Sequence, residues 1–187
     1  MYRLNIFVLA CFALSFTASL SAQDAGSFMQ IEIDTLNKEE FLFPDDLNAD
    51  KLNIVMLAIS EEQDNGTLQG DQLIEWYATL NEAGLLNDDV KAWHFSVMKV
   101  PFFIKGIIRG GMADSYEGKL PLDQAGLIFV KPKKFAEQAG IAIDGLPTIV
   151  FVTPDGVLHE MFKGGPTKAR LANVSAAVAA YTATESD

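Results

Sequence analysis

The chain has 187 residues, 49% of them hydrophobic, and its 25 Asp and Glu side chains outnumber 14 Lys and Arg side chains. This length suits one domain with a sizeable core, and the apolar fraction excludes a disordered chain. The net charge of −11 argues against nucleic acid or an anionic membrane as the main partner, because phosphate groups are bound by clustered Lys and Arg.

The first residues have the pattern of a secretory signal peptide. A basic residue precedes an apolar run from Ile6 to Phe16, and small residues follow up to Ala22. The run is too short for a membrane span, which needs about twenty apolar residues, and no later stretch is long enough to span a bilayer. We therefore expect residues 1–22 to be a signal peptide that is cleaved after Ser21 or Ala22, and a periplasmic or secreted location.

Cys11 is the only cysteine of the chain, and it lies inside this segment. The alternative to a cleaved signal is a lipoprotein signal at Cys11, since Val8 to Cys11 loosely resembles a lipobox. If the segment is removed, the remaining chain has no thiol, and disulfide exchange needs a thiolate nucleophile. A thiol-based activity then requires that the segment is retained and that Cys11 acts alone.

Residues 23–50 are expected to form a lead and a β-hairpin. Residues 23–27 are small or polar, and apolar residues alternate with polar ones from Met29 to Ile33, as in a short edge strand. A second short strand is predicted over residues 40–47, which end in a turn at Pro44.

The main domain is predicted over residues 51–182 and begins with a strand, a helix and a strand. Residues 52–59 form a nearly continuous apolar run, which is typical of a strand buried on both faces. A polar loop over 60–67 and an amphipathic helix up to residue 84 follow, and residues 91–98 alternate as a second strand. This order predicts a parallel β-α-β unit.

The next segment is expected to add a short helix, a strand and another helix. Pro101 suits the first position of a helix that we expect to end near Arg109, because the segment contains three glycines, Gly106, Gly110 and Gly111, which weaken a helix. An apolar strand is predicted over 127–130, and a helix over 133–140.

The end of the domain is predicted to be an antiparallel β-hairpin and a helix. Residues 149–152 are β-branched and apolar, a Pro-Asp-Gly turn follows at 154–156, and residues 157–164 alternate. An alanine-rich stretch over 167–181 has apolar residues at helical spacing, and residues 183–187 are a tail.

The proline before this hairpin, Pro147, and the order of elements resemble a redoxin-type member of the thioredoxin-like superfamily. The resemblance implies a three-layer α/β/α sandwich with an N-terminal β-hairpin, an inserted strand and helix, and a C-terminal antiparallel hairpin plus helix. Such enzymes carry Cys-x-x-Cys in the loop after the first core strand, where this chain has Gln63 to Gly66 without cysteine. Among thioredoxin-like families, the chain looks most similar to the cysteine-free periplasmic YtfJ family.

The resemblance also implies a groove between that loop and the turn before the hairpin. In relatives, a cis-proline at the position of Pro147 holds an extended peptide, although here it could serve only as a structural turn. The residues predicted to line this groove are Glu61, Glu62, Gln63, Asp64, Asn65, Gly66, Leu146, Pro147 and Thr148.

The predicted function is a non-catalytic module that binds an extended peptide or a protein in the export compartment. The alternative is an enzyme without thiol chemistry, in which Glu61, Glu62 or His94 acts as an acid or base around the same groove. No cofactor motif is present, and we expect no metal site, because His94 and His159 are far apart and have no second ligand at metal spacing. His94 should point to the face of its strand opposite to Trp93.

Overall fold

The computed structural model describes residues 26–153 and 157–184. The predicted signal peptide with Cys11, the turn at 154–156 and most of the predicted tail lie outside the described residues.

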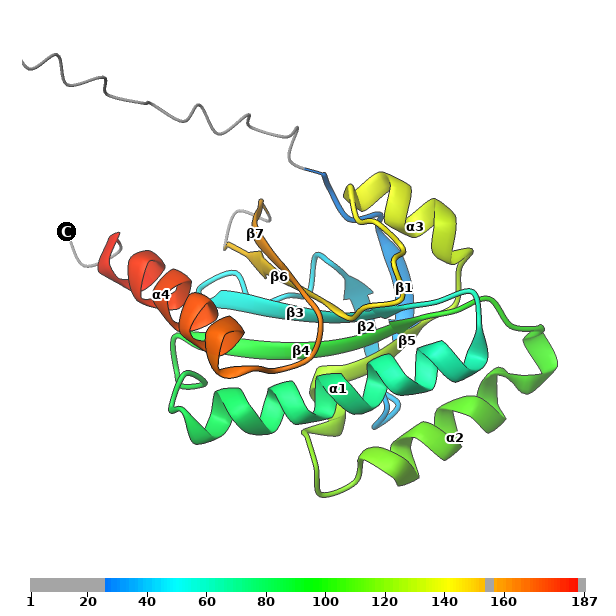
Figure 1. Cartoon of the computed structure of the whole chain (residues 1–187). Coiled ribbons are helices and arrows are strands. Elements are labelled where there is room, and N and C mark those ends of the chain that lie inside the picture. The colour runs from blue at the N-terminus through cyan, green and yellow to red at the C-terminus, as the bar shows by residue number, and fades with distance from the viewer. Residues whose placement is uncertain (1–25, 154–156, 185–187) are drawn as a thin grey trace, which may run out of the picture.

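The centre of the structure is a five-stranded sheet with the strand order β5-β4-β3-β6-β7 (Figure 1). Its strands are β3 (Leu52–Ile59), β4 (Val90–Val97), β5 (Ala125–Ile128), β6 (Thr148–Val152) and β7 (Leu158–Lys163). β4 runs parallel to β3 and β5, whereas β6 runs antiparallel to β3 and β7. The predicted β-α-β unit, the inserted strand and the C-terminal hairpin are therefore confirmed.

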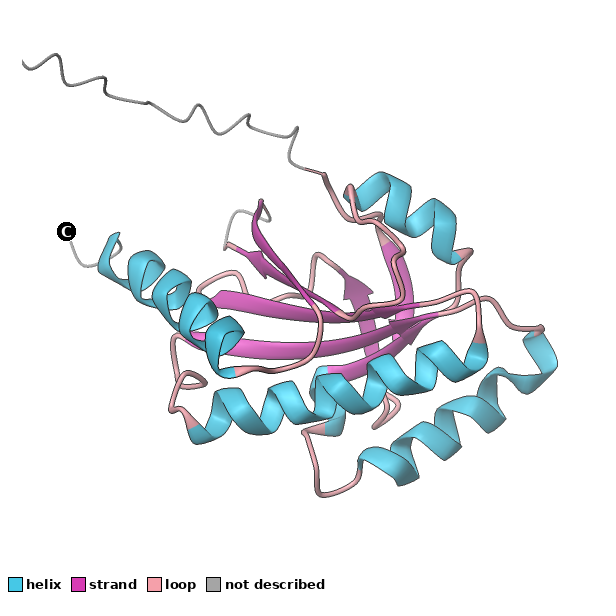
Figure 2. Cartoon of the chain, in the orientation of Figure 1, coloured by secondary structure: helices cyan, strands magenta, loops and turns pink. Residues whose placement is uncertain are grey.

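Helices and a second small sheet cover the two faces of this sheet (Figure 2). The helices are α1 (Gln63–Glu82), α2 (Lys105–Tyr116), α3 (Pro132–Ala139) and α4 (Lys168–Thr184), and two short 3-10 helices are η1 (Phe102–Ile104) and η2 (Leu122–Gln124). The small sheet is the N-terminal hairpin of β1 (Ile31–Asp34) and β2 (Glu40–Phe43). α1 and α4 pack on one face, and α3 and the hairpin pack on the other, which gives the predicted three layers.

The side chains of β3 alternate between the two cores. Val55 and Leu57 belong to the core under α3 and the hairpin, whereas Ile54 and Met56 belong to the core under α1 and α4. All eight residues of β3 are buried, as expected for a central strand covered on both faces. Each large apolar side chain that becomes fully buried contributes about 1.5–3 kcal/mol to the free energy of unfolding.

The largest differences from the predicted helix bounds are at the start of α1 and at the end of α2. α1 begins at Gln63, inside the stretch predicted as a polar loop. The first residues of this helix are mostly exposed to solvent, so polar side chains are compatible with a helix there. α2 continues beyond Arg109 to Tyr116 through two glycines. Packing of Ile108, Met112 and Tyr116 on one face of α2, four residues apart, offsets the cost of about 1 kcal/mol for each helical glycine.

Candidate binding site

A cavity opens where the parallel strands β3 and β4 end. Its volume is about 1150 Å³, and its walls come from the segment after β3, the segment after β4 and the start of α3. Open α/β sheets place ligands at the carboxyl ends of their parallel strands. We call this space the edge cavity.

One wall of the edge cavity is apolar and belongs to α2 and the residues before it. Ile104, Ile107, Ile108 and Met112 line this wall. These residues recur at a spacing of three or four along the chain, so they share the side of η1 and α2 that faces the cavity. The wall can take up an apolar side chain of a ligand.

The rims of the edge cavity carry both signs of charge. Glu61, Glu62 and Asp71 lie on the side of α1, and a second group of charged residues lies on the side of α3: Lys131, Lys133, Lys134 and Glu137. Lys133 forms an exposed i,i+4 pair with Glu137, with 3.9 Å between nitrogen and oxygen, and such a pair contributes little to stability. The acidic rim can attract positive groups of a ligand, and the rim with the three lysines can attract its negative groups.

A buried polar pair lies beneath the cavity. Tyr116, which lines the cavity, has its hydroxyl oxygen 3.4 Å from Nε2 of His94. Burial lowers the pKa of His94 to about 3, so the imidazole is neutral at neutral pH. Burial also raises the pKa of Tyr116 to about 12, against the opposing effect of a hydrogen bond with Ser96.

Gly70 of α1 makes room for this tyrosine. A Cβ at residue 70 would lie 2.9 Å from the Tyr116 hydroxyl oxygen, closer than real Cβ atoms approach. The hydroxyl can therefore lie against α1 only because residue 70 has no side chain.

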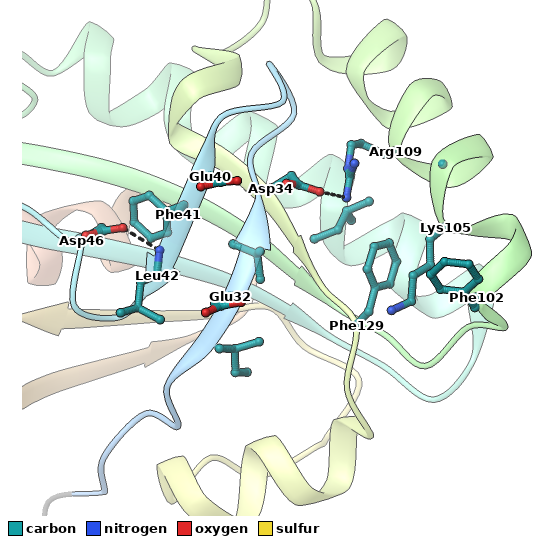
Figure 3. A pocket seen from close by; sticks show the side chains of 14 residues that line it. Glu32, Asp34, Glu40, Phe41, Leu42, Asp46, Phe102, Lys105, Arg109 and Phe129 are labelled. Atoms are coloured by element: carbon teal, nitrogen blue, oxygen red, sulfur yellow. Dashed lines mark hydrogen bonds and ion pairs between the residues drawn. The ribbon is translucent and has the colours of Figure 1, made fainter.

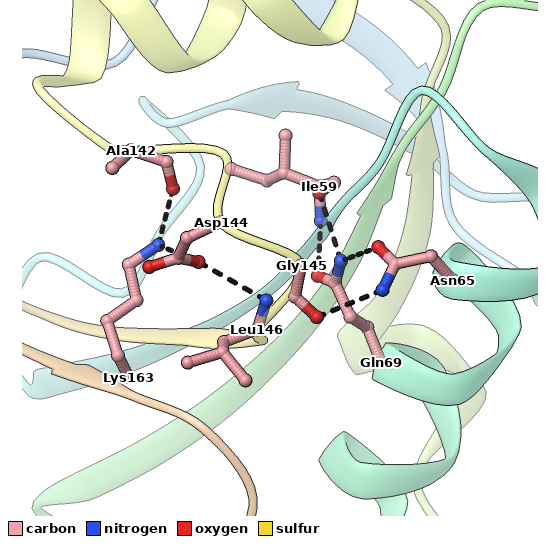
Figure 4. A network of polar contacts seen from close by, with 8 residues as sticks. All are labelled: Ile59, Asn65, Gln69, Ala142, Asp144, Gly145, Leu146 and Lys163. Carbon is pink, nitrogen blue, oxygen red and sulfur yellow. Dashed lines mark hydrogen bonds and ion pairs between the residues drawn. The ribbon is translucent and has the colours of Figure 1, made fainter.

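The first turns of α1 are fixed to the strands by the polar network of Figure 4. Gln69 accepts a hydrogen bond of 2.9 Å from the backbone N–H of Ile59 and donates one of 3.1 Å to the Ile59 carbonyl. Its amide also donates to the Asn65 side-chain oxygen at 2.6 Å, and Asn65 donates to the carbonyl of Gly145 at 3.0 Å. The network joins α1, the end of β3 and the turn before β6.

The hydrogen bond from Asn65 to Gly145 joins the two predicted halves of the groove. Glu61, Glu62, Gln63 and Gly66 line the edge cavity, whereas Asp64 and Asn65 do not. Neither described cavity is lined by the turn residues Leu146, Pro147 and Thr148. The cavity lies on the α2 and α3 side of the α1 terminus.

Backbone groups in the turn are already hydrogen-bonded within the chain. The N–H of Leu146 donates to the Asp144 carboxylate at 3.2 Å, and the carbonyl of Pro147 accepts from the N–H of Gly164 at 2.8 Å. Pro147 is buried. Among the described residues the cis peptide bond precedes Pro44, so the bond before Pro147 is trans, which agrees with the alternative that Pro147 serves as a structural turn.

The enzyme alternative requires that His94 borders the cavity, but His94 does not border it. Its side chain does lie on the face opposite to Trp93, but that face is covered, and His94 is only 2% exposed. The neutral imidazole reaches the cavity only through Tyr116. Glu61 and Glu62 remain on the cavity rim without a basic partner among the salt bridges of the described part of the chain.

A second cavity of about 890 Å³ lies between the N-terminal hairpin and α2 (Figure 3). Asp34 of β1 forms an ion pair of 2.5 Å with Arg109 of α2 across it. Lys105 places its Nζ 4.8 Å from the centre of the Phe129 ring. We call this space the hairpin cavity.

Sequence reasoning missed the wall and floor of the edge cavity. Met112 and Tyr116 were not candidates, because helix α2 was predicted to end near Arg109, and Ser96 was read only as part of the second core strand. The available signal was the parallel β-α-β unit itself, which places the segment after the second strand beside the segment after the first.

In the described residues, no group of three or more His, Cys, Asp and Glu side chains could hold a metal ion. None of the helices in that part of the chain is long and apolar enough to cross a membrane.

Comparison with known proteins identifies the fold. No protein-family model matches the chain, and no curated protein matches it by sequence. Among solved structures, the mitochondrial 2-Cys peroxiredoxin from Plasmodium falciparum matches with a TM-score of 0.55 and 9% identity over 87% of this chain and 95% of that chain. BsSco, a member of the Sco family of cytochrome c oxidase assembly proteins, matches with a TM-score of 0.52 and 10% identity over 83% and 95% of the two chains.

A putative electron transfer protein from Aquifex aeolicus VF5 also matches, with a TM-score of 0.51 and 13% identity over 79% of this chain and 94% of that chain. Together with the layers and strand order described above, these similarities define a thioredoxin-like fold. The chain has no Cys-x-x-Cys pair, because Cys11 is its only cysteine.

Proposed function

We propose that this chain is a periplasmic or secreted thioredoxin-fold protein that binds a protein segment or an extended peptide without redox chemistry. The single observation that carries the proposal is the edge cavity at the carboxyl ends of β3 and β4 in a chain that has only Cys11. We place the site in this cavity rather than at the turn of Leu146 to Thr148. We also propose that the chain is similar to the cysteine-free periplasmic YtfJ family.

The lining of the cavity supports a peptide as the ligand. An apolar wall at Ile104 and Ile107 lies between an acidic rim and a basic rim. An extended peptide presents apolar and charged side chains along one strand, so it can use the wall and the rims together. Tyr116 and Ser96 on the floor add polar groups that can fix its orientation.

Two glycines of α2 provide a matched test of this site. Gly111 lines the edge cavity and Gly110 lines neither described cavity, and a Cβ at either residue meets nothing within 4 Å. Gly111→Phe should therefore fill part of the cavity without strain, whereas Gly110→Phe adds the same side chain outside it.

The probe is reduced, carboxymethylated α-lactalbumin with a fluorescent label, which stays extended and has no free thiol. Fluorescence anisotropy should show saturable binding to the wild type, and Gly111→Phe should weaken it about tenfold, as expected for the loss of one apolar contact. Gly110→Phe should bind as the wild type does. Equal binding by all three proteins contradicts the proposed site, and thiol-dependent reduction of insulin by the wild type contradicts the absence of redox chemistry.

A further inference from the structure

The most exposed large apolar side chains of the described residues lie together at the start of α2. Phe102 is 86% exposed, Phe103 is 80% exposed and Ile107 is 75% exposed. They belong to η1 and to the first turn of α2, and no residue of η1 is buried. We call these three residues the apolar ridge.

The ridge projects between the two cavities rather than lining one groove. Phe102 borders the hairpin cavity, Ile107 borders the edge cavity, and Phe103 borders neither. Figure 3 shows Phe102 at the outer end of the hairpin cavity, with Lys105 between it and Phe129. Adjacent apolar side chains that stay this exposed mark a surface that contacts a membrane or another protein.

The segment that carries the ridge is basic, unlike the whole chain. Residues 99–112 include Lys99, Lys105 and Arg109 and no acidic residue, although the net charge of the chain is −11. Arg109 is paired with Asp34, but no salt bridge in the described part of the chain includes Lys99 or Lys105. Three further lysines, at 131, 133 and 134, line the same edge cavity as Lys99.

We propose that the apolar ridge docks on the surface of an anionic lipid bilayer. Phe102, Phe103 and Ile107 would enter the boundary between headgroups and acyl chains, and Lys99 and Lys105 would lie beside lipid phosphates. A convex ridge with flanking lysines suits a fluid surface, which needs no complementary shape. Carboxylates also line the two cavities beside the ridge, and only acidic residues more than about 8 Å from the contact are screened from the lipid at physiological salt.

Ile107 and Lys99 belong to both the docking surface and the edge cavity, whereas Phe102 and Phe103 do not line the edge cavity and so test docking separately from the peptide site. The double variant Phe102→Ser/Phe103→Ser removes two of the three ridge side chains, and their exposure means that the core is unchanged. Leu68→Ser is the matched control, because Leu68 is an exposed apolar residue of α1, 54% accessible, that lines neither described cavity.

The test is cosedimentation of the expected mature chain, residues 23–187, with sucrose-loaded vesicles. Vesicles of phosphatidylcholine mixed with phosphatidylglycerol should bind the wild type and Leu68→Ser equally, and the double variant about tenfold or more weakly. Lys99→Gln/Lys105→Gln should remove the preference for phosphatidylglycerol over phosphatidylcholine alone.

Failure of the wild type to sediment with the mixed vesicles overturns the proposal, as does equal binding by the double variant. Sedimentation equilibrium without lipid tests the alternative that the apolar ridge contacts a second copy of the chain. Self-association that the double variant abolishes, in a protein that does not bind vesicles, assigns the ridge to contact between copies and also overturns lipid docking.

Discussion

The substitution Gln69→Leu tests whether the side-chain amide of α1 holds the end of β3. Gln69 is fully buried, and its amide pairs with both backbone groups of Ile59. Leucine has a similar size but no polar atoms, so the Ile59 N–H and carbonyl would lose these buried partners. The Asn65 side-chain oxygen would lose its contact with Gln69 as well.

The expected loss follows from the two backbone groups. Each unsatisfied buried group costs about 1–3 kcal/mol, so we expect Gln69→Leu to lower the free energy of unfolding by about 3 kcal/mol after the gain from the apolar leucine. Urea unfolding followed by far-UV circular dichroism measures the change, provided that the slope of the transition is unchanged.

Gln138→Leu is the control, since it makes the same chemical change at an exposed position of α3. Surface substitutions of this kind change the free energy of unfolding by about 0.5 kcal/mol or less. If Gln69→Leu costs no more than Gln138→Leu, then the polar network does not hold α1 to β3.

Two further predictions concern α2 and the buried histidine. Gly110→Ala should raise the free energy of unfolding by about 0.5–1 kcal/mol, because residue 110 is an exposed position inside a helix; an unchanged or lower urea midpoint would show that the helix does not continue through it. His94 has its pKa lowered by burial from 6.5 to about 3, so between these values the unfolded chain binds a proton that the folded chain does not. Stability should therefore fall by several kcal/mol as the pH falls through this window, and urea titrations should show a smaller fall in His94→Gln. An NMR titration of His94 with a midpoint near its ordinary value in the folded protein would refute this assignment.

The strands and the layers could be predicted because their signals are local. The apolar run of β3 has the same bounds in the structure, and the hairpin of β6 and β7 follows from alternation around a turn. The N-terminal hairpin was also predicted, since Met29, Ile31 and Ile33 alternate with polar residues. Such patterns depend on the spacing at which apolar residues recur along the chain, and this spacing can be read from the sequence alone.

The site was harder to predict because it depends on helix ends and on contacts across the chain. The polar residues from Gln63 to Gly66 read as a loop, whereas packing of Leu73 and Trp76 further along supports a helix that starts there. The bond between Asn65 and Gly145 joins residues 80 positions apart, which no local pattern reveals. That hydrogen bond links the two predicted halves of the groove.

The most direct test of whether a peptide binds in the edge cavity is a chemical-shift titration. Carboxymethylated α-lactalbumin peptides would be added to the ¹⁵N-labelled mature chain, and the backbone amide shifts recorded. We predict that the shifting amides cluster at Thr67, Ser96 and Met112 around the edge cavity. Shifts confined to Leu146 and Thr148, or no shifts at all, would contradict the account.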